Sequence, residues 1–413
     1  MELKTKYQYS YFIHPFVIDE KKYDQYLLKL LKDKHCDLKV FEKGKDLDMY
    51  TYFLPTVRQY MFASFDWDKE KVKQLNEFDD HTKAVLLSKL PCTIFEYQLG
   101  KDVQGKVGEK NGIFFSVTKM EIICFQTGIG FITMKTNLEQ EDTFSDVLNF
   151  NYKFRDINSD FISLKDYENI RLQTSSFKDI KDLSTIIKKI TGSNIDAKQM
   201  NLEDERFLTY AYVCIDQEQW NETNTFENIQ GEFLKFAHIL PSHTQVNLEA
   251  NAEEVIPFQS LKYAKVGVTK QGTVLLTSTI HTQNYTKIPY AFEREYLYTY
   301  ILALYKKLYL KKVNLDLKRR KDFESTRTQF IDFTQSIWIQ EITNDIGGSQ
   351  LYRTWRQTLE LDTLYLEMKN KYDVVYKDLN IEKNRKISYI IAIVLFCILG
   401  FNIINFILIY MRK

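Results

Sequence analysis

The sequence predicts an α+β fold: a cytosolic mixed α/β domain followed by a long helical stalk and one C-terminal transmembrane helix. Three observations predict it. The first 155 of the 413 residues are rich in short strand-like runs, a helical pattern takes over from about Pro289, and residues 387–410 carry no charged side chain. Aromatic residues make up 15% of the chain while Gly and Pro are scarce, so we expect a folded chain almost throughout.

Residues 1–155 form the first predicted subdomain. Aromatic and β-branched residues gather there in short runs interrupted by Pro, Gly, Asp or Asn, which is typical of strands. A helix is expected at about residues 21–34, and another at 143–154, directly after a hairpin whose turn contains Gly128 and Gly130. The expected strands cover residues 7–18, 49–54, 59–65, 93–98, 112–117 and 120–125.

Residues 156–288 form the second predicted subdomain, in which the order of strand, turn, strand and helix recurs. The two subdomains are therefore candidates for a related pair, although their residues barely match. The expected strands are 207–215, 263–268 and 273–279, and the expected helices are 177–190 and 226–237.

Residues 289–386 form the predicted helical stalk. Pro289 suits the first turn of a helix that continues to about residue 321, and a second helix at 323–343 should end at Gly347-Gly348-Ser349. The last helix should start near Leu351 and run without Pro or Gly into the membrane. Its apolar residues recur at heptad spacing, which predicts a seam that packs either within the chain or between subunits. The seam comprises Leu361, Tyr365, Met368, Tyr372, Val375 and Leu379.

Residues 387–411 form the predicted transmembrane helix. The 24 uncharged residues 387–410 would extend about 36 Å as a helix, enough to cross a hydrocarbon core of about 30 Å. Three basic residues lie between positions 383 and 386, and no signal peptide is visible at the N-terminus. We therefore expect the N-terminal part to stay in the cytosol, although Arg412 and Lys413 also place positive charge on the far side.

Gly400, Asn402 and Asn405 are the candidate site residues within this span. Polar groups inside a membrane need partners, so we predict that these residues mediate helix–helix association or line a pore. Association alone is the simpler interpretation. A monomeric span is also compatible with them, because Asn is cheaper to insert than a charged residue.

Composition and motifs exclude several classes of function. The 56 basic and 55 acidic residues nearly balance, so no nucleic acid partner is predicted. No phosphate-binding loop, HExxH, CxxC, GxSxG or GxGxxG occurs, so we predict a protein that is not an enzyme and has no cofactor. The five cysteines have no paired or metal-type spacing: Cys36, Cys92, Cys124, Cys214 and Cys397.

A rival enzyme hypothesis depends on five residues of the first subdomain. Asp66 and Asp68 could act as paired carboxylates, and Asp79, Asp80 and His81 could bind a divalent metal. A turn explains the first pair without chemistry. A helix N-cap with acids in the first turn explains the second group equally simply.

The strongest charge feature is a run of basic residues on the helix after Pro289. It could contact anionic headgroups or nucleic acid, but such spacing is more typical of the solvated face of an amphipathic helix. The run comprises Lys306, Lys307, Lys311, Lys312, Lys318, Arg319, Arg320 and Lys321. Trp338 and Trp355 are expected on helices within the core.

The layout resembles the CorA-type magnesium transporter superfamily. Architecture carries the resemblance over residues 289–402, and Gly400-Phe401-Asn402 stands where the family has Gly-Met-Asn at the end of its first membrane helix. The resemblance implies a pentameric homo-oligomer with a funnel of stalk helices, the asparagine near the pore mouth, and a divalent cation as a partner. The family has a second membrane helix, whereas 11 residues follow Asn402, so we expect one crossing.

The leading functional prediction is a single-pass membrane protein with a cytosolic sensing or scaffolding domain. It would be anchored in the lipid bilayer at its C-terminus and would assemble as a homo-oligomer through stalk and span. One alternative is an ion-conducting or membrane-permeabilising effector. The other is a membrane-tethered enzyme whose site lies in the soluble part.

Overall fold

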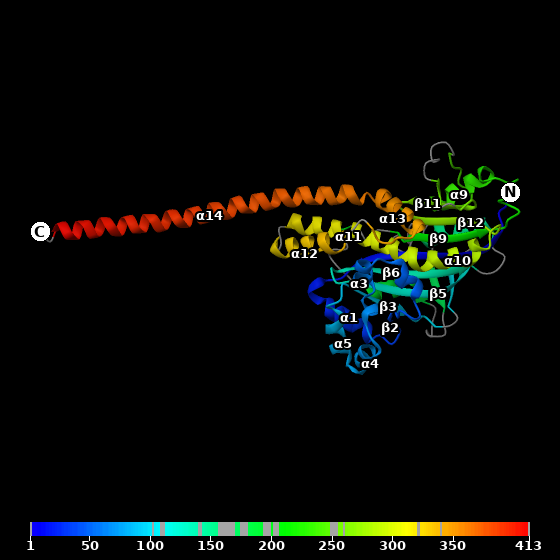
Figure 1. Cartoon of the computed structure of the whole chain (residues 1–413), viewed down its shortest axis with the longest axis horizontal. Helices are drawn as coiled ribbons and strands as arrows, with labels where there is room; N and C mark the ends of the chain where they lie inside the picture. Colours follow the sequence, from blue (N-terminus) through cyan, green and yellow to red (C-terminus); the bar gives the residue numbers. More distant parts are fainter. Residues whose placement is uncertain are drawn as a thin grey trace.

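The computed structural model shows a mixed α+β head from which one long helix, α14 (Leu361–Met411), projects (Figure 1). We call the described chain before α14 the head. The predicted combination of a mixed α+β fold with an apolar C-terminal helix is confirmed. The structure describes residues 2–100, 103–107, 112–138, 143–155, 170–173, 181–192, 200, 206–247, 255–258, 261–319, 323–338 and 341–411.

The head is built on a twelve-stranded sheet. Its strands follow the order β10-β11-β12-β9-β1-β6-β5-β4-β7-β8, while β3 pairs with the second half of β5 and carries β2. The β9–β12 pair is parallel and the other pairs are antiparallel. The bounds are β1 Thr5–Val17, β2 Cys36–Leu38, β3 Cys92–Tyr97, β4 Gln104–Val107, β5 Ile113–Phe125, β6 Ile129–Leu138, β7 Ile170–Gln173, β8 Lys181–Asp182, β9 Leu208–Ile215, β10 Val255–Pro257, β11 Ala264–Thr269 and β12 Gly272–Ser278.

Both faces of the sheet are buried, because successive side chains of its central strands enter two separate hydrophobic clusters. On β1, Tyr11 and Ile13 belong to one cluster and Phe12 and Phe16 to the other. This alternation is the period of two expected of a strand, with apolar residues on both faces instead of one. The sheet is therefore the middle layer of three.

Helices form the two outer layers. One face is covered by α2 Leu47–Tyr52, α3 Pro55–Met61, α10 Gln283–Ala291, the π-helix η6 Phe292–Tyr296, α11 Leu297–Arg319, α12 Phe323–Ser336, α13 Ile346–Thr358 and the first turns of α14. The other face is covered by α1 Tyr23–Leu31, α4 Lys69–Glu77, α5 Asp80–Leu87, α6 Phe144–Phe154, α7 Leu183–Thr191 and α9 Gln230–Ala237. Short 3-10 turns lie at η1 Glu20–Lys22, η2 Ala63–Asp66 and η4 Phe226–Ile229.

Strands from the two predicted subdomains share this sheet. The first strand, β1, lies between β6 from residues 1–155 and β9 from residues 156–288. Of the helices that follow, α10, α11 and α13 pack on the sheet, α12 packs on α11, and α14 projects from the head (Figure 1).

Two strands expected near the N-terminus are helical in the structure. Residues 49–54 lie mostly in α2, and residues 59–65 lie in α3 and η2. Met49, Tyr52 and Phe53 are buried, at the spacing of three and four residues that places side chains on one helical face. The aromatic composition suggested strands, but the period of the buried positions is that of a helix.

The helix expected to begin at Pro289 begins six residues earlier, at Gln283, so Pro289 lies inside it. Proline lacks an N–H and disrupts the regular hydrogen bonding of a helix, and the chain widens into the π-helix η6 three residues later. Two tyrosines of the sheet compensate at this point. The Tyr9 hydroxyl donates to the carbonyl oxygen of Pro289 at 2.6 Å, and the Tyr210 hydroxyl donates to that of Phe292 at 2.8 Å.

The last two helices also begin at residues other than those expected. Gly347 and Gly348 do not break a helix but lie in the first turn of α13, where the Asp345 carboxylate accepts the Gly348 N–H at 2.7 Å. The last helix begins at Leu361 instead of Leu351, because Glu360 adopts a positive φ of 56° that separates α13 from α14.

Candidate functional site

Helix α14 joins the head to an exposed apolar segment without a break. The helix has 51 residues, so it extends roughly 76 Å. Its segment Asn384–Asn405 is long and apolar enough to cross a membrane, and none of that segment is buried in the structure. The predicted span is thus confirmed as an apolar helix by length and composition.

The predicted heptad seam packs within the chain over its first part. Leu361 and Met368 are buried, and the Tyr365 ring stacks on Trp338 with ring centroids 4.4 Å apart. Further along, Tyr372 lies 5.9 Å from the ring of Phe330 on α12. The root of α14, residues 361–372, is therefore attached to the head through the seam side chains. Val375 is half-buried, and the Leu379 side chain lies outside the described part.

The candidate residues of the span lie on two different sides of α14. Asn402 is exposed and Asn405 half-exposed, and a spacing of three residues places them on one face. Gly400 precedes Asn402 by two residues, which in a continuous α-helix turns it about 200° away. A Cβ atom added at Gly400 would meet nothing within 4 Å. Gly400 therefore lies on a different side of the helix from Asn402.

The five residues of the enzyme hypothesis do not form a described pocket. Asp66, Asp68, Asp79 and His81 are exposed, and Asp80 is half-buried. Asp68 caps α4 by accepting the Lys71 N–H, and Asp79 caps α5 by accepting the N–H groups of His81 and Thr82. The capping interpretation of Asp79 is confirmed. Among the described residues no three His, Cys, Asp or Glu side chains are grouped so that they could hold a metal.

The sequence suggested that the basic run on α11 forms a solvated face. In the structure, two of its lysines are buried instead. Lys306 is fully buried and Lys312 is 6% exposed. The Lys312 ammonium contacts the carboxylate of Glu20, and Lys306 lies against Tyr352 of α13. The side chains of the remaining members from Lys318 onward lie outside the described part.

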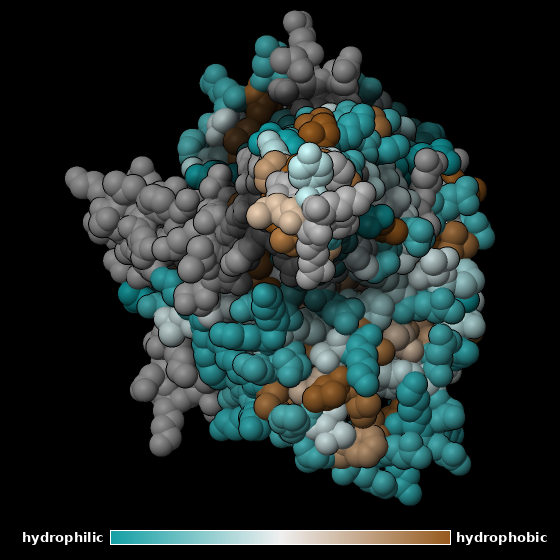
Figure 2. Space-filling view, turned by 90° about the vertical axis from the view of Figure 1, so that its left-hand side faces the viewer, coloured by the Kyte–Doolittle hydropathy of each residue, from teal (hydrophilic) through white to brown (hydrophobic). Residues whose placement is uncertain are grey.

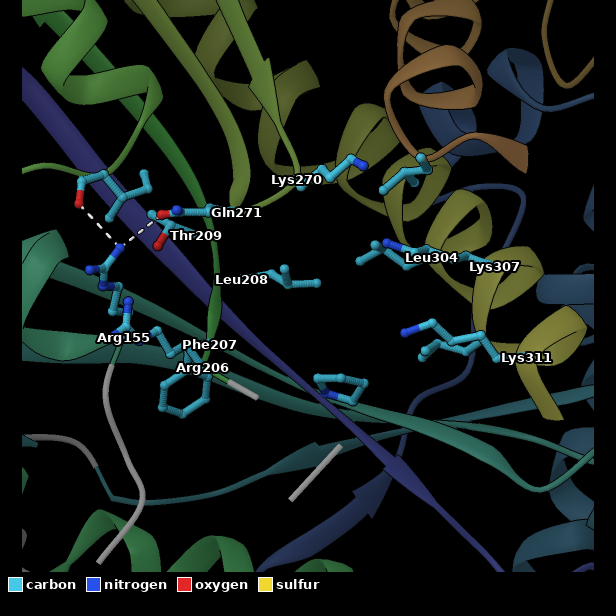
Figure 3. A pocket seen from close by; sticks show the side chains of 14 residues that line it. Arg155, Arg206, Phe207, Leu208, Thr209, Lys270, Gln271, Leu304, Lys307 and Lys311 are labelled. Carbon is cyan, nitrogen blue, oxygen red and sulfur yellow. Dashed lines mark hydrogen bonds between the residues drawn. The ribbon is translucent and has the colours of Figure 1, made fainter. Parts of the chain in front are cut away.

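Lys307 and Lys311, the other two members, line a basic cavity of about 350 Å³. The cavity lies between α11, the start of β9 and the turn that joins β11 to β12 (Figure 3). Five cationic side chains line it: Arg155, Arg206, Lys270, Lys307 and Lys311. No Asp or Glu is among the described residues that line this cavity.

One wall of the cavity is a single face of α11. Leu304, Lys307, Leu308 and Lys311 follow the spacing i, i+3, i+4 and i+7, which places them on one side of a helix. Figure 3 shows the amino groups of Lys307 and Lys311 pointing from α11 toward Leu208 of β9. The wall therefore presents two half-buried ammonium groups above an apolar surface.

The opposite wall is held by Arg155, which follows the end of α6. Arg155 is 6% exposed, and its guanidinium donates to the Gln271 side-chain oxygen at 2.8 Å and to the Ile239 carbonyl oxygen at 3.4 Å. It also lies over the Tyr152 ring at 4.5 Å. These contacts fix the β11–β12 turn, and with it Lys270, at the cavity rim.

A carboxylate stands beside this rim. The Lys270 ammonium lies 2.9 Å from the carboxylate of Glu360, the residue that separates α13 from α14. The hydrogen bond and charge of Lys270, together with the charge of Lys307, lower the pKa of Glu360. The cavity is thus electrostatically connected to the start of α14.

Sequence reasoning singled out two of the five cations, because Lys307 and Lys311 belong to the conspicuous run. Arg155, Arg206 and Lys270 come from three separate segments, and no local pattern connects them. The alternation of leucine and lysine on one face of α11 was the one local pattern in the sequence that pointed to a wall of this cavity.

Comparisons with known proteins add no relative from which a function could be transferred. No protein-family model matches the chain, and neither the curated proteins nor the solved structures give a match. The function must follow from the geometry of the chain itself.

Proposed function

We propose that the chain is a single-pass membrane protein that holds a sensing or scaffolding domain at the end of a rigid helical stalk. The continuity of α14 carries this proposal. One helix is packed in the head at its root, and over Asn384–Asn405 it is apolar with no residue buried. A bilayer is the environment in which such an exposed apolar helix is stable, because its backbone groups are satisfied internally.

The geometry supports a head that lies outside the bilayer. Helix α12 lies beside α14 as far as Tyr376, whose ring is 5.7 Å from the Arg327 guanidinium, and α14 rises roughly 12 Å more from there to Asn384. Figure 2 looks along α14 at the face of the head that would be turned toward the membrane. On its described part hydrophilic residues predominate and the hydrophobic ones form small separate groups, unlike the continuous apolar surface of a membrane-embedded face.

The cytosol is the compartment that we propose for the head. Lys383, Arg385 and Lys386 directly precede the apolar segment, and positive residues flanking a span are retained on the cytosolic side. The four cysteines of the head are buried free thiols, Cys36, Cys92, Cys124 and Cys214, as suits a reducing compartment.

Replacement of apolar residues in the span tests the anchor. Ile393→Asp combined with Ile398→Asp should release the protein from sedimented membranes, because each acidic residue near the middle of a span costs about 3 kcal/mol. The matched control is Leu366→Asp with Ile381→Asp, which alters exposed apolar residues of α14 before the span and should leave the protein in the membrane fraction. Wild-type protein in the soluble fraction would contradict the anchor.

Self-association through Asn402 and Asn405 extends this proposal. The two amides share one face of an apolar helix, where an amide gains from a hydrogen bond to a neighbouring helix. In detergent, wild-type protein should have an oligomeric mass by light scattering, and Asn402→Leu with Asn405→Leu should lower it. Asn370→Leu, at an exposed position of α14 before the span, is the control. A monomeric wild type would remove this part of the proposal.

An ion-conducting assembly, as the CorA-like layout would imply, is the second candidate function. The asparagine pair favours it, because amides facing the axis of an oligomer can line a water-filled path. Reconstituted protein should then pass ions, and the Asn402→Leu and Asn405→Leu variants should pass fewer. Equal flux in all forms, or none, would leave anchoring and scaffolding as the function.

A further inference from the structure

We infer that the membrane-facing end of the α11–α12 pair binds anionic lipid headgroups. The site consists of Lys318 and Arg319, which end α11, together with Arg385 and Lys386 in the first turn of the apolar segment of α14. The inference rests on the proposed anchor and goes beyond it, because it names a class of lipid that the head itself recognises.

Helix α12 runs back along α14, which fixes the level of its start relative to the membrane. The rings of Phe330 and Tyr372 lie 5.9 Å apart, and the Arg327 guanidinium lies 5.7 Å from the Tyr376 ring. A step toward the start of α12 is therefore a step along α14 toward the membrane. The first residue of α12 lies four residues before Arg327, so its level is about 6 Å closer to the membrane and about 6 Å short of the apolar segment.

Helix α11 ends near the same level as α12 begins. The Glu20 carboxylate contacts both Lys312 of α11 and Gln329 of α12, which places these two residues side by side. From Lys312 to the end of α11 at Arg319 the helix rises about 10 Å, and from Gln329 back to the start of α12 it rises about 9 Å. Figure 1 shows the two helices extending beside α14 toward its C-terminal end.

This level is that of the lipid headgroups. A bilayer is about 40–45 Å thick with its headgroups and about 30 Å without them, so each headgroup layer takes up about 5–8 Å. The ends of α11 and α12 therefore lie in this layer or within a Debye length of it, which is about 8 Å at physiological ionic strength. The charge of anionic lipids acts on basic residues at this distance.

Positive charge prevails at this level. Residues 318–324 and 382–386 together contain seven basic and three acidic residues, and Arg385 and Lys386 are exposed. The dipole of α11 favours cations at its end, which explains Lys318 and Arg319 alone. Two groups of cations brought to one level repel each other unless anions lie between them. Clusters of four to eight basic residues beside a span are typical of sites for anionic lipids.

The test measures which lipids surround the start of α12. The full chain carries Ser325→Cys, at an exposed position of α12, and Cys397→Ser, which leaves the four buried cysteines unchanged. A fluorescent probe on the introduced thiol is read in vesicles of phosphatidylcholine and phosphatidylserine, in which one lipid or the other carries a nitroxide quencher near its headgroup. Quenching by the two labelled lipids at equal mole fraction gives a selectivity ratio.

The ratio should favour phosphatidylserine at least about threefold, because each basic residue near an anionic surface strengthens binding about fivefold. Lys318→Gln with Arg319→Gln should lower the ratio at least about twofold. A roughly tenfold rise in salt concentration should lower it in the same way, because exposed charges are screened. The salt measurement uses the chain with its basic residues intact, so it does not depend on the folding of the double variant.

The matched control is Lys287→Gln with Lys369→Gln, which removes two positive charges at exposed positions away from this level and should leave the ratio unchanged. A probe at Gln335, exposed near the other end of α12 and about 15 Å further from the membrane, should be quenched weakly by both lipids. A ratio of one in a chain that floats with the vesicles, or equal loss in the control and the site variant, would overturn this inference alone. A chain that does not float with the vesicles would overturn the anchor as well.

Discussion

The Nζ atom of Lys306 donates to the hydroxyl oxygen of Tyr352 at 2.6 Å, in a buried contact between α11 and α13. Two aromatic rings face the ammonium, that of Tyr352 at 5.0 Å and that of Trp338 at 5.9 Å. Burial, and then the charge of Arg356, lower the pKa of Lys306 to about 7, against the opposing effect of Asp362. Because Trp338 also stacks on α14, this lysine lies at the attachment of the stalk.

Lys306→Met should make the free energy of unfolding less dependent on pH. The pKa of about 7 in the folded state lies below the unfolded value of 10.5, so between them the unfolded chain binds more protons. The stability of wild type therefore rises with pH in this window, by up to about 1.4 kcal/mol per pH unit. Urea unfolding of the full chain in detergent between pH 7 and 8.5 measures the slope.

The control for this measurement is Lys369→Met, at an exposed position of α14. It should keep the wild-type dependence of the unfolding free energy on pH. Cysteine and tyrosine side chains also titrate at higher pH, but they are the same in wild type and in both variants. If Lys306→Met and wild type have equal slopes, Lys306 does not titrate with the shifted pKa.

Leu361→Ala should destabilise the head, whereas Leu366→Ala should not. Leu361 is fully buried at the root of α14, and Leu366, one and a half turns further along, is 56% exposed. Truncating a buried leucine costs about 2–5 kcal/mol, while an exposed one contributes little. The midpoint temperatures of thermal unfolding of the two variants, measured in detergent, show whether the seam packs within the chain or between subunits. Equal effects would mean that Leu366 is buried in an assembly.

Features with a local cause could be predicted from the sequence. The hairpin turn before Gly130 needs a residue that tolerates a positive φ, and Gly128 supplies it with a φ of 79°. The cap at Asp79 and the helix after Thr143 depend on neighbours within three residues. The apolar segment of α14 is equally local, because its length and composition are sufficient to identify it.

Features that depend on distant contacts could not be predicted. The positive φ of Glu360, which separates α13 from α14, has no signal in the sequence, since the residue is neither Gly nor Asn. Pro289 is accommodated inside a helix by hydroxyl groups that arrive from β1 and β9. The basic cavity likewise exists because the sheet brings Arg155 and Lys270 opposite α11. Residues more than 100 positions apart carry no mutual pattern in one sequence.

Gly272→Ala should destabilise the sheet beside the basic cavity. Gly272 begins β12, and a Cβ atom there would lie 1.9 Å from the backbone oxygen of Thr209 on β9. The strands would have to separate locally, which costs about 1–3 kcal/mol. Gly44→Ala, where a Cβ meets nothing within 4 Å, should be neutral or slightly stabilising. Urea midpoints of the two variants measure the difference, and a neutral Gly272→Ala would contradict the close approach.

Glu121 carries the most completely buried carboxylate in the described part of the head. The side chain has no exposed surface, and its Oε1 atom accepts from Lys39 at 2.6 Å, from Tyr298 at 2.9 Å and from Lys119 at 3.0 Å. Burial alone would raise the pKa of Glu121, but the charges and hydrogen bonds of Lys119 and Lys39 outweigh it and lower the pKa to about 2.

Glu121→Gln should therefore cost about 3–5 kcal/mol near neutral pH, because two poorly hydrated ammonium groups lose the buried carboxylate that they share. The folded-state pKa of about 2 lies below the ordinary glutamate pKa of 4.5, so the stabilisation is complete above pH 4.5 and is lost as the pH falls toward 2. Urea unfolding should show a smaller gap between wild type and variant at pH 3 than at pH 5. Glu96→Gln, which removes a 39% exposed partner of Lys39, should cost less than about 1 kcal/mol. A gap for Glu121→Gln that is the same at both pH values would mean that the carboxylate is not stabilised by its lysines.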